Sequence, residues 1–230
     1  MLFAMATQTI LDNLKTTKGY LGIADQSPPP NHINTHMDLL IWNCRGAGNK
    51  KFKRNPRKLV LIHKPDLMVL METKVDLASM GTFFNQMGFT TLTYVDSIGR
   101  SGGIWMLWSP ISVNVRVTEV SSQLITAKIA KQEYLEWLFL AVYASPVHSK
   151  REEMWNSLEN IAQTTSAPWM IASDFNDFAS QEEKRSFASN PNSSQDQRRT
   201  KTFANRMNCC NIMDLECSGP QLTWTNNRKG

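Results

Sequence analysis

This chain of 230 residues lacks the cysteine motifs of zinc sites and lacks long apolar runs. Its four cysteines show no Cys-x-x-Cys or Cys/His spacing, so the sequence indicates no zinc site and we expect free thiols. No apolar run approaches the roughly 20 residues that a membrane-spanning helix needs. The sequence therefore indicates neither a structural zinc site nor a membrane-spanning helix.

Targeting signals are also missing from the beginning of the chain. Met1–Leu14 has no basic residue ahead of its apolar stretch, and no arginine precedes Arg45. These features argue against a secretory signal and against a mitochondrial transit peptide. We therefore expect an intracellular protein of the nucleus or the cytoplasm that is not secreted.

Apolar and aromatic residues are plentiful. They make up 41% and 9% of the chain, with seven Trp and ten Phe, which is typical of a globular protein with a sizeable core. The length suits one domain. The net charge of +5 and the pI of about 9.1 are compatible with a polyanionic partner but do not by themselves indicate one.

A proline-rich stretch separates two parts of the sequence. The segment Ser27-Pro28-Pro29-Pro30 fits neither a sheet nor a helix interior. We expect residues 1–36 to be a disordered leader or linker and residues 37–230 to form one domain, incomplete at its C-terminus.

The hydrophobic pattern within that domain is mixed. It predicts helices at about 52–63, 78–87, 149–163 and 199–209, and strands at about 38–43, 67–71, 90–94, 103–108, 112–119, 124–131, 137–143, 169–173 and 222–224. The order is βαβα, then successive antiparallel strands, then αβ. It predicts an α+β fold in which two stacked mixed or antiparallel sheets are flanked by helices.

Polar residues stand where strongly apolar strands end. They are Asn43, Glu72, Tyr143 and Asp174, with Asn176 just beyond. An apolar strand that ends in one polar group delivers that group to the rim of its sheet, and residues two apart point to the same side. When each residue is taken singly, a structural role explains it better than a catalytic one: a strand cap, an exposed acid, a core aromatic, or an Asx-turn at Asp174.

An ordered set of motifs contains these residues. They are Ile41-Trp42-Asn43-Cys44-Arg45-Gly46, Met71-Glu72-Thr73-Lys74, Val142-Tyr143-Ala144-Ser145-Pro146, Ser173-Asp174-Phe175-Asn176 and Leu222-Thr223-Trp224-Thr225-Asn226. From about Asp38 to its end the chain resembles the endonuclease domain of plant LINE-type retrotransposons, in the DNase I-like endonuclease/exonuclease/phosphatase family. The resemblance implies a four-layer α/β/β/α sandwich.

The resemblance also implies a chemistry, namely Mg²⁺-dependent nicking of DNA that primes reverse transcription, with Mn²⁺ as an alternative metal. Glu72 would bind the metal, with Asn43 beside it. Asp174 would orient or deprotonate the attacking water. Asn176 and Tyr143 would hold the scissile phosphate and its developing charge.

Two departures from the family pattern bear on the expected activity. Ser173 replaces the usual glycine, where we expect little harm because a small residue remains. The family pattern continues beyond Gly230 to a Ser-Asp-His motif, so we expect the last strands to be missing and catalysis to be impaired. The alternatives are an inactive truncated remnant that at most binds nucleic acid, and a phosphatase of the same superfamily.

Basic residues form two groups. The first opens the predicted helix at 52–63, where a solvated helix face is an equally good explanation. The second flanks a polar loop, and there we predict contacts with DNA phosphates. The predicted nucleic-acid-binding residues are Arg185, Arg198, Arg199 and Lys201.

Overall fold

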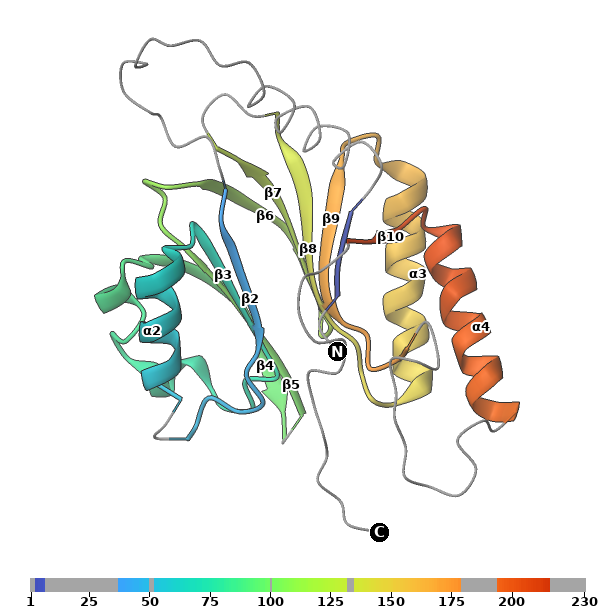
Figure 1. Cartoon of the computed structure of the whole chain (residues 1–230), viewed down its shortest axis with the longest axis horizontal. Coiled ribbons are helices and arrows are strands. Elements are labelled where there is room, and N and C mark those ends of the chain that lie inside the picture. Colours follow the sequence, from blue (N-terminus) through green and yellow to red (C-terminus); the bar gives the residue numbers. More distant parts are fainter. Residues whose placement is uncertain are drawn as a thin grey trace, which may run out of the picture.

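Two β-sheets stack face to face, and helices cover the outer face of each, so that the molecule has four layers (Figure 1). This computed structural model describes residues 3–6, 37–49, 52–99, 101–131, 135–178 and 194–215. The predicted α+β fold of two stacked sheets with flanking helices is confirmed.

The smaller sheet has the strand order β2-β3-β5-β4. β2 (Leu39–Asn43) and β3 (Leu67–Met71) are parallel, and α2 (Arg54–His63) connects them across the outer face. β4 (Thr91–Ile98) and β5 (Ser101–Trp108) form an antiparallel hairpin, and β5 pairs with β3. The parallel pair brings the carboxyl ends of β2 and β3 to one edge of the sheet.

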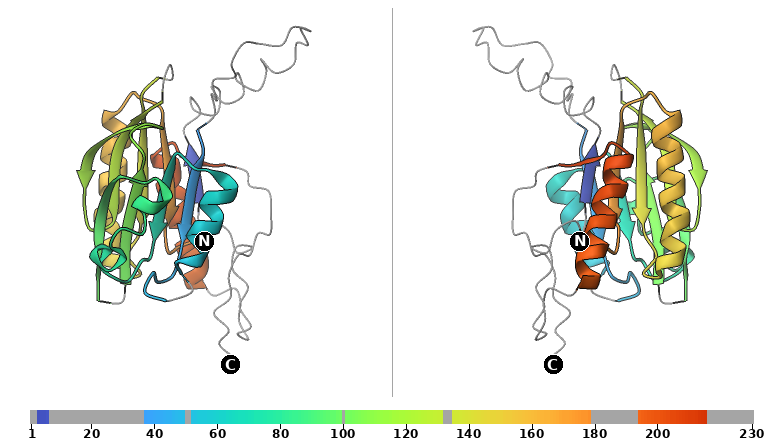
Figure 2. Two further views of the ribbon diagram at one scale, coloured as in Figure 1. Left: turned by 90° about the vertical axis from the view of Figure 1, so that its left-hand side faces the viewer. Right: turned by 90° about the vertical axis from the view of Figure 1, so that its right-hand side faces the viewer.

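The larger sheet has the order β10-β1-β9-β8-β7-β6. Its strands are β1 (Phe3–Ala6), β6 (Asn114–Val120), β7 (Leu124–Ala130), β8 (Trp137–Tyr143), β9 (Trp169–Asp174) and β10 (Met213–Asp214). β8 and β9 are parallel and are connected by α3 (His148–Thr164). α4 (Ser194–Cys209) lies beside α3 on the outer face of this sheet (Figures 1 and 2).

Alternation of side chains along the strands divides the core into three layers. In β3, Leu67, Val69 and Met71 pack between the two sheets, whereas Met68 and Leu70 pack outward toward the α2 side. In β8, Phe139, Ala141 and Tyr143 are in the layer between the sheets, and Leu138, Leu140 and Val142 pack with α3 and α4. Both faces of these strands are buried, which explains why they are apolar throughout.

An ion pair joins the sheets at the end of β3 away from its carboxyl terminus. Lys131 follows β7, and its Nζ lies 2.7 Å from Oδ2 of Asp66, which precedes β3. The two side chains are only 10% and 13% exposed. The same carboxylate oxygen accepts a hydrogen bond from the backbone N–H of Asp38. The pair therefore fixes the beginnings of β2 and β3 against the larger sheet.

The segment predicted as a helix at 78–87 forms two short 3-10 helices instead, η2 (Leu77–Met80) and η3 (Asn85–Met87). Gly81 ends the first with φ +53°, a conformation that interrupts a continuous helix. Gly88 ends the second and is left-handed at φ +92°. The predicted strand at 222–224 and the expectation of missing last strands lie outside the described residues.

The predicted leader contributes a strand that its sequence did not reveal. β1 (Phe3–Ala6) lies between β9 and β10 and is antiparallel to both. Residues 7–36 lie outside the described part of the chain, so the domain boundary at 37 stays a prediction. In the described residues no helix is both long and apolar enough to cross a bilayer.

Proline substitutions in β1 test whether this strand contributes to stability. Ala4 and Met5 pair with Ala172 and Ile171 of β9, and a proline in a sheet removes a ladder hydrogen bond. We expect the double change Ala4→Pro, Met5→Pro to lower the free energy of unfolding by about 2 kcal/mol, because each lost ladder hydrogen bond contributes about 1 kcal/mol; urea denaturation measures it. The matched control changes Ala4 to serine and Met5 to leucine, which keeps both backbone N–H donors. Equal stability of all three proteins would show that β1 does not stabilise the sheet.

Candidate active site

Three of the predicted site residues occupy strand positions that face the space between the sheets. Tyr143 lies in that layer with Ala141. Asp174 is two residues after Ala172, which packs in the same layer, and residues two apart share a face. Asn43 follows Ile41 by two residues, and Ile41 packs against this layer too. The alternation that buries the apolar core therefore also directs these polar groups inward.

A hydrogen bond between the sheets joins two of these residues. Nδ2 of Asn43, at the end of β2, donates to Oδ2 of Asp174, at the end of β9, over 2.5 Å. The other carboxylate oxygen of Asp174 accepts the backbone N–H of Asn176 at 3.1 Å. This second bond is the predicted Asx-turn, so the structural role at Asp174 is confirmed and coexists with the contact across the sheets.

Asn176 connects the ends of β8 and β9. Its backbone is left-handed at φ +48°, and its Nδ2 donates to the carbonyl oxygen of Ala144 at 2.6 Å. Ala144 in turn donates its backbone N–H to the carbonyl oxygen of Asp174 at 2.9 Å. The polar groups that follow the two parallel strands are thereby held in register.

Glu72 reaches the site through a backbone conformation that interrupts strand alternation. It follows Met71, which faces inward, so a regular strand would turn Glu72 outward. Its φ is +57°, and that of Lys74 is +59°, which is uncommon for residues with a side chain and is found at functional sites. Oε1 of Glu72 lies 2.7 Å from Nζ of Lys74, and the Glu72 charge acts on Tyr143 across the space between the sheets.

Glycines in β5 make room for the loop that carries Glu72. A Cβ on Gly103, where φ is +88°, would lie 2.1 Å from Oγ1 of buried Thr73. Thr73 and Lys74 donate their backbone N–H groups to the carbonyls of Gly103 and Gly102. A side chain at Gly103 would therefore displace the Glu72 loop.

The Cys44 thiol lies behind the same loop and holds it from the other side. Its Sγ is 3.3 Å from the carbonyl oxygen of Met71 and 3.8 Å from that of Glu72. Burial raises the pKa of Cys44 to about 11. The group is therefore a protonated hydrogen-bond donor at neutral pH and not a reactive thiolate.

The Tyr143 hydroxyl is kept neutral by its surroundings. Burial raises the pKa of Tyr143, and the negative charges of Glu72 and Asp174 raise it further. Hydrogen bonds with the side chains of Asn176 and Ser101 oppose this rise. The shift remains upward, so at neutral pH the hydroxyl carries its proton and can donate it to an anionic oxygen.

The oxygen donors at the site fit a hard divalent cation. The Glu72 carboxylate and the Asn43 amide oxygen are ligands of the type that Mg²⁺ prefers, and Mg²⁺ is commonly bound by one or two carboxylates while keeping several waters. The Glu72 side chain is 19% exposed, so it can be reached from solvent. Within the described ranges no cluster of three or more His, Cys, Asp or Glu residues forms a closed metal cage.

Two buried residues support the site, and their motifs did not reveal them. Gln123 accepts the Ser145 N–H at its Oε1 over 2.5 Å, and its own carbonyl accepts the Tyr143 N–H. Nη1 of Arg151 donates to the carbonyls of Ser145 and Pro146, each at 3.1 Å. Gln123 precedes β7 and Arg151 lies in α3, and both hold the end of β8. Only the folded chain brings them to it.

Of the four predicted nucleic-acid-binding residues, the structure places two in one cavity. Arg198 and Arg199 line a cavity between α3 and α4. Lys201 is exposed on α4 and does not line that cavity. Arg185 lies outside the described residues.

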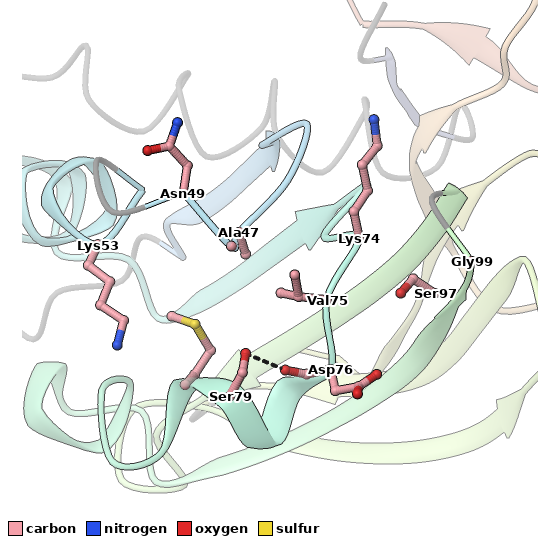
Figure 3. A pocket seen from close by; sticks show the side chains of 11 residues that line it. Ala47, Asn49, Lys53, Lys74, Val75, Asp76, Ser79, Ser97 and Gly99 are labelled. Carbon is pink, nitrogen blue, oxygen red and sulfur yellow. Dashed lines mark hydrogen bonds between the residues drawn. The ribbon is translucent and has the colours of Figure 1, made fainter.

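A larger cavity of about 770 Å³ lies beside the Glu72 loop. Lys74 lines it, as does Lys53 from the turn before α2. Figure 3 shows Asn49 and Lys74 on the loops that follow β2 and β3, and Ser97 on the β4 hairpin. The cavity therefore adjoins the predicted metal ligand through Lys74.

The motifs and the geometry agree with a comparison of the sequence with family models. The model of the Endonuclease/Exonuclease/phosphatase family matches residues 40–229. The chain belongs to the endonuclease/exonuclease/phosphatase family. No curated protein matches the sequence closely enough to be counted as a relative. The plant retrotransposon branch within the family stays a prediction.

Two solved endonuclease structures are similar to this chain in fold. The endonuclease domain of TRAS1, a telomere-specific non-LTR retrotransposon, has a TM-score of 0.53 at 10% identity, covering 76% of this chain and 72% of that one. An AP endonuclease from Archaeoglobus fulgidus has a TM-score of 0.50 at 16% identity, with 74% and 70% covered. A truncated TDP2 from Caenorhabditis elegans reaches 0.44 at 17% identity, and the alignment covers 66% of each chain.

The raised pKa of Tyr143 predicts a loss of stability in alkali. A folded-state pKa above the unfolded value of about 10 contributes stability that is complete below that pH and is lost as the pH rises through the folded value. We expect the free energy of unfolding of Tyr143→Phe to fall less above about pH 10 than that of the wild type. Chemical denaturation across this range measures it. Tyr94→Phe, at a tyrosine 45% exposed, is the control and should follow the wild type; parallel curves for all three would contradict the assignment.

Ser173, which replaces the family glycine, has a buried hydroxyl for which the described residues offer no hydrogen-bond partner. Such a group costs about 1–3 kcal/mol, so the substitution is less neutral than we expected from the sequence. Ser173→Ala should raise the free energy of unfolding by about 1 kcal/mol, measured by thermal and urea denaturation. Ser157→Ala on α3, where the hydroxyl of this half-buried residue donates to the Glu153 carbonyl, is the control and should not gain stability. A loss of stability in Ser173→Ala would show that the hydroxyl is satisfied.

Proposed function

We propose that the chain is a Mg²⁺-dependent endonuclease domain that nicks DNA and that derives from a retrotransposon polyprotein. The observation that carries the proposal is the hydrogen bond of Asn43 to Asp174 across the two sheets. Burial raises the pKa of Tyr143, and the charges of Glu72 and Asp174 lie close enough to raise it further. Residues from four separate motifs thereby meet at one place. The structural role of each residue alone does not require this meeting.

The roles follow from what each group can do where it lies. Glu72 and Asn43 would hold the metal, which when bound acts as a Lewis acid on the phosphoryl oxygens. Asn43 has a second task, because its Nδ2 fixes one oxygen of Asp174. Pairing with Lys74 holds the Glu72 carboxylate in place without a metal.

Asp174 is the group that positions and deprotonates the attacking water. Hydrogen bonds from Asn43 and from the Asn176 backbone reach its two oxygens, so the carboxylate cannot rotate freely. A base held in this way can orient water as well as accept its proton.

Tyr143 and Asn176 stabilise charge on the scissile phosphate. The neutral Tyr143 hydroxyl donates a hydrogen bond to an oxygen whose negative charge grows as the water attacks. Asn176 is held by Ala144 beside this hydroxyl and contributes amide polarity. Donors that are already oriented lower the barrier without reorganisation during the reaction.

The substrate and the origin rest on the motifs. Trp42-Asn43-Cys44-Arg45-Gly46 and Tyr143-Ala144-Ser145-Pro146 have the form of the retrotransposon endonucleases and not of the phosphatases of the same superfamily. The TRAS1 domain, similar in fold, is itself named as a retrotransposon endonuclease. These features support DNA as the substrate and a plant LINE-type element as the source.

A chain that binds nucleic acid without cutting it is the second candidate. The resemblance calls for a histidine at the phosphate. In the described part of the chain the histidines are His63, at the end of α2, and His148, at the start of α3. Neither lies on a strand end of the site. The observation that favours the second candidate is the cavity lined by Arg198 and Arg199, which can bind nucleic acid without cutting it.

Plasmid nicking separates the two candidates. With Mg²⁺ we expect the full chain to convert supercoiled to open-circular DNA, and Asp174→Asn to lower the rate by about 10²–10⁴-fold because the base is lost. Glu72→Gln should need more Mg²⁺ for half-maximal rate, since a charged ligand is lost. EDTA should abolish nicking.

The control is Glu119→Gln, the same chemical change at an exposed strand residue of β6. It should nick like the wild type. If the wild type is folded by circular dichroism and does not nick with Mg²⁺ or Mn²⁺, the endonuclease proposal fails and the non-catalytic candidate holds. Nicking that persists in Asp174→Asn would reject this residue as the base.

A further inference from the structure

A second cavity, of about 370 Å³, lies between the two outer helices of the larger sheet. α3 and α4 run side by side there (Figures 1 and 2). Its lining includes Arg151 and Trp155 of α3 and Arg198, Arg199 and Phe203 of α4. The volume is in the range of ligand sites.

The walls of this cavity begin at the candidate active site. His148 lines it and is five residues after Tyr143, and Asp177 lines it directly after Asn176. Arg151 ties the two walls together, because it donates to the Ser145 and Pro146 carbonyls and lies 3.6 Å from Oδ2 of Asp177. The cavity therefore continues from the ends of β8 and β9.

Among the described residues that line the cavity, positive charge exceeds negative charge. Asp177 is shared by two guanidiniums, with Oδ2 at 3.6 Å from Arg151 Nη2 and Oδ1 at 3.3 Å from Arg199 Nη2. One carboxylate cannot neutralise both. Arg198 is exposed beside them, and in the described ranges it takes part in no ion pair. The excess charge calls for an anion.

Arg206 lines the same cavity, but its charge is neutralised by carboxylates of the protein. Its guanidinium is bound by both Glu152 and Glu159, and these carboxylates raise the pKa of Arg206. Its charge is therefore compensated within the protein. The uncompensated charge is localised at Arg199 and Arg198.

The Arg199 guanidinium packs against an aromatic ring and remains accessible to an external partner. It lies 5.5 Å from the centroid of the Phe178 ring, a contact that fixes the plane of the group. Its Nε is buried and has no hydrogen-bond partner in the described part of the chain. The side chain as a whole is 37% exposed, so the group can be reached from solvent. A guanidinium that solvent reaches is suited to donate to a phosphate oxygen.

We propose that the cavity between α3 and α4 is a phosphodiester subsite in which Arg199 binds a backbone phosphate of the nucleic-acid strand that runs through the active site. The proposal rests on the proposed function, because it makes this cavity the place where the substrate strand leaves the ends of β8 and β9. Arg198 adds charge at the rim. Arg151 positions the walls.

The salt dependence of nucleic-acid binding tests this subsite. Fluorescence anisotropy of a short labelled DNA duplex, titrated with the full chain in EDTA between about 50 and 200 mM NaCl, gives the slope of log K against log salt. We expect Arg199→Gln to weaken binding about tenfold and to reduce the slope by about 0.9, the value for one phosphate contact. Arg199→Lys should keep most of the slope but lose affinity, because it keeps the charge and loses the planar fork.

Arg116→Gln is the matched control, since Arg116 is exposed on β6 and pairs with Glu136. It should leave the slope unchanged. An RNA duplex of the same sequence, titrated in parallel, identifies the source of the phosphate, because an Arg199-dependent slope on either duplex supports the subsite. A folded Arg199→Gln protein with the wild-type slope on both duplexes overturns it, as does a wild-type chain that binds neither.

The result is separable from the test of catalysis. Binding is measured without metal, so a chain that does not nick can still show an Arg199-dependent slope. The subsite then stands while the nuclease proposal fails. A chain that nicks, but whose slope does not depend on Arg199, rejects the subsite alone.

Discussion

Packing of the two sheets against each other is the constraint on which the site depends. The layer between them is built from alternate residues of β3, β5, β7 and β8, and almost all of them are apolar and buried. Burial of this face fixes the register, because a shift by one residue would turn every side chain to the opposite face. Asn43, Tyr143 and Asp174 occupy the strand positions whose side chains face this layer. The hydrophobic effect that packs the two sheets together therefore also turns these three side chains inward.

The two sheets supply matching halves of the site. β3 has parallel β2 on one side and antiparallel β5 on the other, and β9 has parallel β8 and antiparallel β1 in the same relation. Each parallel pair ends in one carboxylate and one neutral polar group: Glu72 with Asn43, and Asp174 with Tyr143. The contact across the sheets thus joins unlike partners, an amide from one half and a carboxylate from the other. Separating the metal ligand from the base in this way gives each a different environment.

Much of this arrangement could be predicted from the sequence. Continuous apolar strands, the βαβ units and the polar residues at strand ends indicated stacked sheets with helices outside. The motifs pointed to the residues that meet. The misses have local causes: Gly81 splits the helix predicted at 78–87, and β1 is too short and too far along the chain from its partners for a periodic signal. Gln123 and Arg151 support the end of β8 from positions that carry no motif, and only their contacts reveal them.

The sequence by itself determined the apolar central strands, the alternation of their side chains and the chemical types at their ends, because these are local properties of the chain. Tertiary structure alone decided which ends meet. Asn43 and Asp174 are 131 residues apart, and their hydrogen bond exists because two sheets close on each other. Glu72 is the sharpest case: strand parity would turn it away from the site, and a left-handed backbone, accommodated by Gly102 and Gly103 of β5, turns it back. No local pattern encodes a conformation that a neighbouring strand makes room for.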